Sequence, residues 1–175
     1  MGSQSYGIAQ ELNGAEPQSP TETAWQTSAH SRSRILIGDQ SADGSILIGL
    51  DLTLDPPYKT YWRSPGDSGF APIISTQGST NIASIDVRWP VPRRFSDASG
   101  VINGYEKSLI LPILIKPHNE NSAITLHFTM DYGVCHTQCV PTHVKHTVLI
   151  PALKAAATNN LASSRSEERR VGKEC

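Results

Sequence analysis

SILIGLDLTL, residues 45–54, is the stretch that decides the fold. In its second half, leucines at every second position fall on one face of an extended strand, while Asp51 and Thr53 fall on the other. Asp-Gly at 43–44 precedes it and follows a short apolar run at 34–38, a pairing that is a strong hairpin signal. The pattern therefore predicts two antiparallel strands with one buried face.

Comparable short runs continue along the chain, separated by turn residues at intervals of about 8–12 residues, and helix-like periodicity is nearly absent. This spacing predicts an all-β chain folded as an antiparallel sandwich. We expect a polar loop at 93–104 and a helix only at 152–162. The further expected strands are 58–64, 71–76, 82–89, 108–115, 123–134 and 143–150.

Two of these segments give a weaker pattern. In 143–150, Val144 and Thr147 do not share a face, so the sequence leaves the register of this strand open. The segment YKTYWRS at 58–64 is rich in aromatic residues, which could stack on a base or a sugar. A strand that buries Trp62 in the core is the more ordinary explanation.

The ends of the chain differ in composition from its middle. Residues 1–33 are polar and without periodicity, and we expect a mostly disordered leader that begins with residues added for expression. A single β-sandwich redox domain is expected at 34–151, followed by a tail at 152–175. Within that tail, 163–175 (SSRSEERRVGKEC) resembles translated vector sequence and is expected not to be native.

Composition excludes several functional classes. The formal net charge of −1 gives no basic surface for nucleic acid. No apolar run reaches the roughly 18 residues that span a bilayer. Asp67, Asp86 and Asp131 are scattered, and the sequence contains neither a GxSxG elbow nor a phosphate-binding loop.

Setting Cys175 aside with the tail leaves Cys135 and Cys139, in the segment DYGVCHTQCVP at 131–141. They flank a tight connection between two expected strands, which places them within reach of a disulfide. Closing so small a loop removes only about 2 kcal/mol of unfolded-chain entropy, so the disulfide would stabilise the fold only weakly. That magnitude favours redox exchange, although the spacing alone also allows an ordinary stabilising disulfide.

Histidines beside the cysteines raise a metal-binding alternative. Cys135, Cys139 and His143 have a spacing compatible with zinc or cuprous copper. Structural zinc prefers four ligands, however, and His143 and His146 would point to opposite faces of a strand. We therefore expect no metal and no cofactor, and treat His136, His143 and His146 as surface residues, one of which could lower a thiol pKa.

Three stretches together resemble a known family: YKTYWRSPGDSGFAP at 58–72, GYEKSLILPILI at 104–115 and DYGVCHTQCVP at 131–141. They are similar to the N-terminal periplasmic domain of the DsbD family of thiol:disulfide interchange proteins. The likeness covers residues 34–151 and is closer to the branch that includes the ScsB (suppressor of copper sensitivity) proteins.

This resemblance implies an immunoglobulin-like sandwich in the periplasm, fused to a membrane domain in the full-length protein and forming part of a protein-disulfide reductase. Its expected partners are thioredoxin-like domains, which supply electrons, and oxidised periplasmic disulfide proteins, which accept them; the branch adds a link to copper tolerance. The exchanging pair carries over onto Cys135 and Cys139. Cys139 is expected to form the mixed disulfide with partners, and Cys135 to resolve it.

The sequence departs from the best-known members of the family in two respects. Their cysteines are further apart, and a cap loop with an aromatic residue covers the pair. By order along the chain the cap would fall at 95–104, where Phe95 or Val101 could shield the cysteines. The alternative function is a non-redox binding module with a structural disulfide, which holds copper or zinc through Cys135, Cys139 and His143 or docks other proteins.

Overall fold

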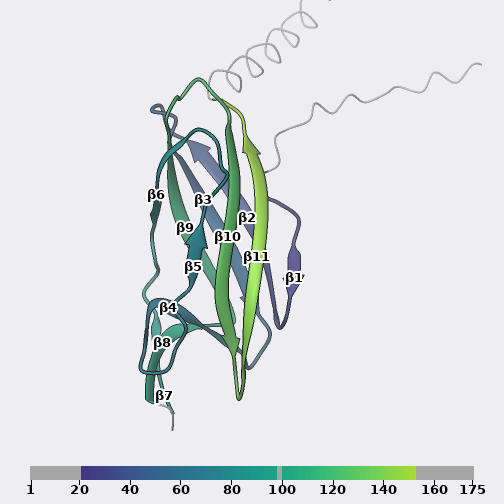
Figure 1. Cartoon of the computed structure of the whole chain (residues 1–175), viewed down its shortest axis with the longest axis vertical. Helices are drawn as coiled ribbons and strands as arrows, with labels where there is room; N and C mark the ends of the chain where they lie inside the picture. The colour runs from purple at the N-terminus through teal and green to yellow at the C-terminus, as the bar shows by residue number, and fades with distance from the viewer. Residues whose placement is uncertain (1–20, 98–99, 153–175) are drawn as a thin grey trace, which may run out of the picture.

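The computed structural model describes residues 21–97 and 100–152, in which two antiparallel β-sheets pack as a sandwich (Figure 1). The predicted all-β antiparallel sandwich is therefore confirmed. Within these described ranges the chain forms no helix long and apolar enough to cross a membrane. The expected helix at 152–162 and the tail at 163–175 lie almost wholly outside the described residues, as does most of the expected leader at 1–33.

The first sheet consists of β1 (Gln26–Ser28), β2 (Ser31–Gln40), β3 (Ile46–Leu54), β9 (Ser108–Pro117) and β6 (Ile82–Val87), in that spatial order. The second has the order β11 (Cys139–Ile150), β10 (Ile124–Cys135), β4 (Lys59–Gly66), β8 (Gly100–Glu106) and β7 (Arg93–Asp97). The short β5 (Ile73–Ser75) also pairs with β10. β4, β8 and β7 lie at the end of the sandwich where the long β10–β11 hairpin turns (Figure 1).

Alternating apolar residues of the central strands form the main core between the sheets. In the β3–β9 ladder Leu50 pairs with Leu111 and Leu52 with Leu109, and all four side chains are buried. Complete burial of a leucine side chain stabilises the fold by about 1.5–3 kcal/mol relative to exposure. The leucine face predicted from 45–54 is thus the face that the first sheet turns toward the core.

The β10–β11 hairpin contributes the opposite wall of the core. Every even-numbered residue of β10, from Ile124 to Val134, is buried. On β11 the inward residues are also even-numbered, and they include His146 at 1% exposure. A polar residue on the inward face explains why the hydrophobic pattern left the register of 143–150 open.

His146 is held in the core by one side-chain partner. Its Nε2 atom lies 2.9 Å from the hydroxyl oxygen of Ser33 on β2, so the contact joins the two sheets. Burial disfavours the charged imidazolium and lowers the pKa of His146. The predicted opposition of His143 and His146 is confirmed, because His143 is exposed on the other face of the strand.

One expectation about the elements was wrong. The expected loop at 93–104 contains β7 and most of β8, which pair as a hairpin. Its exposed positions are mostly polar, so this hairpin lacks the alternation that identifies a half-buried strand. The strands of the first sheet begin before the expected boundary at residue 34, with β1 and the first three residues of β2. Trp62 packs against the main core, as the core explanation of 58–64 expects, and its side chain is half-buried.

Replacing His146 with Gln should reduce the acid sensitivity of folding. In the wild type the unfolded chain binds a proton near the ordinary histidine pKa of about 6.5, whereas the folded state resists it, so stability is lost as pH falls below that value. The loss is at most about 1.4 kcal/mol per pH unit. Urea unfolding at pH 7.5 and pH 5 measures it for both proteins. An equal loss in wild type and H146Q would assign the effect to another group.

Candidate functional site

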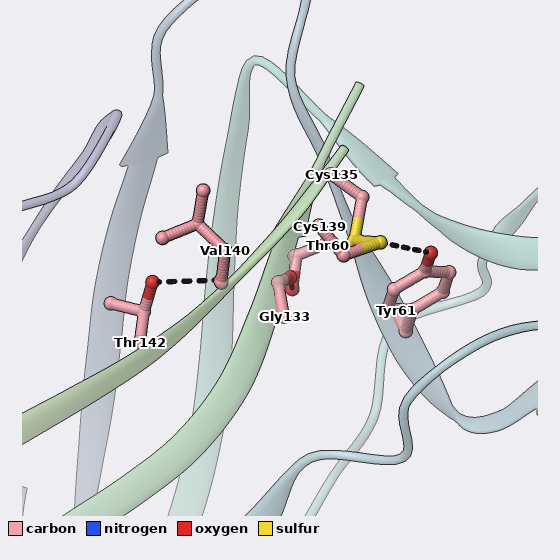
Figure 2. The surroundings of a disulfide bond; sticks show 7 residues. All are labelled: Thr60, Tyr61, Gly133, Cys135, Cys139, Val140 and Thr142. Atoms are coloured by element: carbon pink, nitrogen blue, oxygen red, sulfur yellow. Dashed lines mark hydrogen bonds between the residues drawn. A yellow bond between two sulfur atoms is a disulfide. The ribbon is translucent and has the colours of Figure 1, made fainter. Parts of the chain in front are cut away.

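The two predicted cysteines meet at the tip of the β10–β11 hairpin. Cys135 and Cys139 form the last pair of the antiparallel ladder, and the three residues between them make the turn. A backbone hydrogen bond of 3.1 Å, from His136 N–H to the carbonyl oxygen of Gln138, closes this turn. The sulfur atoms are joined in a disulfide with an S–S distance of 2.07 Å and a Cα–Cα distance of 4.0 Å (Figure 2).

The two cysteines differ in their access to solvent. Cys135 is only 6% exposed, because β10 is paired with β11 on one side and with β4 on the other, where Cys135 faces Lys59. Cys139 begins β11, the edge strand of its sheet, and is exposed. An incoming thiolate or disulfide can therefore reach Cys139 more readily than Cys135.

The disulfide lies on the face of the second sheet that points away from the main core. Tyr132 and Val134 point into the core, so Gly133 and Cys135, at the alternate positions, point outward. There Cys135 packs with Tyr61 and Ile102 in a small cluster of its own. The reactive pair therefore has a separate apolar cover that does not belong to the core of the sandwich.

Gly133 lies where the groups around the sulfurs approach one another closely. A Cβ atom at this position would lie 3.3 Å from the Tyr61 ring and 3.5 Å from the Cys135 sulfur. The hydroxyl of Thr60 donates a hydrogen bond of 2.9 Å to the Gly133 carbonyl and fixes β4 against β10 (Figure 2). This contact sets the distance at which the ring of Tyr61 meets the disulfide.

Tyr61 contacts the exposed sulfur directly. Its hydroxyl lies 3.4 Å from the Cys139 Sγ atom (Figure 2). A disulfide sulfur carries no proton, so Tyr61 is the donor in this contact. Sequence reasoning missed Tyr61 because it treated 58–64 as a core strand; the available signal was that Tyr61 and Trp62, being adjacent, must occupy opposite faces.

The two residues proposed as a cap occupy different environments. Phe95, on β7, is half-buried and packs against the cluster that contains Cys135. The ammonium group of Lys59 lies 4.7 Å from the centre of its ring. Val101 lies on β8, where its N–H donates to the Asp67 carboxylate at 2.9 Å and its carbonyl accepts from the Asp67 N–H at 2.9 Å. Shielding by either residue remains a prediction.

The histidines beside the cysteines are not gathered around the sulfurs. His143 hydrogen-bonds Asp131 at 2.7 Å, and His146 is in the core. His136 lies in the turn, 6.0 Å from the ring of Tyr58 between centroids. Among residues 21–97 and 100–152 no group of three or more His, Cys, Asp or Glu side chains is placed to hold a metal ion. In this disulfide state Cys135, Cys139 and His143 do not form such a group, and metal binding by the reduced cysteines remains untested.

Comparisons with known proteins agree with this geometry. The N-terminal periplasmic domain of ScsB from Proteus mirabilis has 27% sequence identity and a TM-score of 0.61, with 82% of this chain and 58% of that chain covered. The chain therefore matches little more than half the length of that solved domain. The structural similarity to this domain confirms the expected immunoglobulin-like fold.

A yeast GGA1 GAE domain aligns at 11% identity over 74% of this chain and 98% of that chain. Its TM-score of 0.40 is too low to indicate a shared fold. No curated protein matches the chain. Residues 32–151 match the family described as thiol:disulfide interchange protein DsbD, N-terminal. This match covers most of the chain and includes both strands of the cysteine hairpin, so the chain belongs to the DsbD N-terminal family.

Proposed function

We propose that this domain passes two electrons to oxidised protein partners in the periplasm through Cys135 and Cys139. The observation that carries the proposal is the disulfide at the hairpin tip, with Cys139 exposed and Cys135 covered. One sulfur is thereby open to a partner, while the other can react only within the domain.

Exchange proceeds in two balanced steps from the reduced domain. The Cys139 thiolate attacks a partner disulfide; a Cys139–partner bond forms and the second partner cysteine leaves as a thiolate. The Cys135 thiolate then attacks the Cys139 sulfur, the 135–139 bond forms, the Cys139–partner bond breaks, and the first partner cysteine leaves as a thiolate. The pair is oxidised by two electrons and the partner disulfide is reduced to two thiols.

A dithiol donor reduces the Cys135–Cys139 disulfide again by the reverse of these steps. A donor thiolate attacks the exposed Cys139 sulfur, and Cys135 leaves as a thiolate under the cover of Tyr61 and Phe95. The donor we propose is a thioredoxin-like domain, and the proposal is supported by the match of the chain to the N-terminal domain family of DsbD thiol:disulfide interchange proteins. Fusion to a membrane domain belongs to the same proposal, and a periplasmic location is supported by the similar ScsB domain, which is periplasmic.

Tyr61 can assist by stabilising the thiolate form of Cys139. A hydroxyl that donates to a thiolate favours the charged form and lowers the thiol pKa. The contact of 3.4 Å in the disulfide places this donor beside the sulfur on which a mixed disulfide would form.

Trapping tests the unequal roles of the cysteines. Cys135→Ala leaves a Cys139 mixed disulfide with no thiol to resolve it, so a covalent complex with a thioredoxin-like or other periplasmic protein should accumulate in a periplasm. Non-reducing electrophoresis and mass spectrometry identify the complex. Cys139→Ala is the matched control and should trap little, because Cys135 is only 6% exposed. Equal trapping by both variants would contradict the assignment.

The reduction potential separates exchange from a structural bridge. Since the bridge closes a loop of only a few residues and is open to attack at Cys139, its potential should lie above about −300 mV. Equilibration in dithiothreitol buffers, followed by alkylation and mass measurement, gives the value. A potential well below this limit, together with inertness to a thioredoxin-like donor, would indicate a stabilising disulfide.

Tyr61→Phe should raise the pKa of the Cys139 thiol. A hydrogen bond to a charged group contributes about 1.5–3 kcal/mol, and its loss corresponds to about one to two pKa units. The pH dependence of iodoacetamide alkylation, measured in a Cys135→Ala background, reports this pKa. Tyr58→Phe is the matched control, since its ring stacks on His30 with centroids 3.9 Å apart. An unchanged value in Y61F would reduce the contact to packing.

A further inference from the structure

A groove of about 240 Å³ opens on the outward face of the second sheet, next to the disulfide. Cys139 forms part of its lining, together with Phe70, Ile73 and Pro141. The buried Cys135 is not part of that lining. The groove therefore adjoins the sulfur that is open to a partner.

Two large apolar side chains in the walls of this groove are exposed to solvent. Phe70 is 61% exposed and Ile73 is 66% exposed, although both flank a buried strand. They are brought to the groove by the segment around β5, whose Ile73 pairs with Asp131 of β10. Contiguous exposed apolar surface next to a reactive group is typical of a binding site.

The groove follows β11 away from the sulfur. Cys139, Pro141 and His143 occupy alternate positions of the strand and share one face. At a rise of about 3.4 Å per residue, Cys139 and His143 are about 14 Å apart along the strand, which is the length of four extended residues. The far end is polar, because His143 and Asp131 are hydrogen-bonded there at 2.7 Å.

A mixed disulfide fixes what must lie over this groove. A partner cysteine bonded to Cys139 brings its neighbours in sequence to the groove that Phe70, Ile73 and Pro141 line together with Cys139. A charged neighbour would lose water against apolar walls without gaining a partner, whereas an apolar neighbour would cover them favourably.

We propose that the groove beside Cys139 binds the extended segment of an oxidised partner protein that carries the attacked cysteine, and selects an apolar side chain within two residues of that cysteine. This inference rests on the proposed exchange function. A second copy of the chain is a poorer occupant, because the residues between its cysteines, 136–138, are the polar His, Thr and Gln.

Model peptides test the selection with the Cys135→Ala domain, in which Cys175 is also replaced by Ser so that Cys139 is the one reacting thiol and each reaction leaves a stable adduct. Each peptide carries one cysteine as a mixed disulfide with thionitrobenzoate, and the residue two positions away is Leu, Ala or Glu. Stopped-flow absorbance gives the rate of thionitrobenzoate release, normalised to the rate with dithiothreitol, and mass spectrometry confirms the peptide adduct. The Leu peptide should react at least fivefold faster than the Ala peptide, and the Glu peptide should be slowest.

Ile73→Ser and, separately, Phe70→Ser should remove the preference for Leu. Both side chains are largely exposed, so neither change removes a core residue. Leu149→Ser is the matched control: Leu149 is 67% exposed on β11 but outside the groove, and its loss should leave the preference intact.

Three results would overturn the inference, and they differ in what they say about exchange. Equal normalised rates for all peptides would remove the selection but leave the exchange function standing. A covalent homodimer that forms in place of the peptide adduct would make a second copy the occupant. Reaction no faster than that of the unfolded protein with every peptide would overturn the exchange function, and the groove inference with it.

Discussion

The register of the β10–β11 hairpin is the constraint on which the rest of the structure depends. All twelve residues of β10 pair with all twelve of β11, from Ile124 opposite Ile150 to Cys135 opposite Cys139. A slip by one residue would turn the core side chains toward solvent and separate the cysteines. The strand register that buries the core side chains therefore also places Cys135 opposite Cys139, where their sulfur atoms can bond.

This hairpin serves two purposes because its faces are chemically different. The inward face completes the main core, with the hydrogen bond between His146 and Ser33 joining the sheets. The outward face carries Gly133 and Cys135 under a small cover built from β4, β7 and β8. The side chains around the disulfide therefore form a cluster that is separate from the main core.

The cover also makes the two cysteines unequal. Cys135 lies between two paired strands and under Tyr61, whereas Cys139 lies on an edge strand beside an apolar groove. An exchange domain needs one accessible sulfur to meet partners and one protected sulfur to finish the reaction. The unequal exposure of the two cysteines agrees with the exchange function that we propose for this member of the DsbD N-terminal family.

Local patterns were sufficient to predict the sandwich and the cysteine pair. Alternation in 45–54 identified the buried leucine face, and four-residue spacing across a tight turn placed Cys135 and Cys139 within reach of each other, because both depend on neighbours in sequence. The β7–β8 hairpin, the inward position of His146 and the contact of Tyr61 with Cys139 were not predictable in this way. Each depends on which distant strand lies opposite: Tyr61 meets a sulfur 78 positions away because β4 lies beside β10, where Lys59 pairs with Cys135 and Thr60 hydrogen-bonds Gly133. The sequence by itself thus determined which residues could react, and the tertiary structure decided which sulfur is exposed, because exposure depends on the strands packed around it.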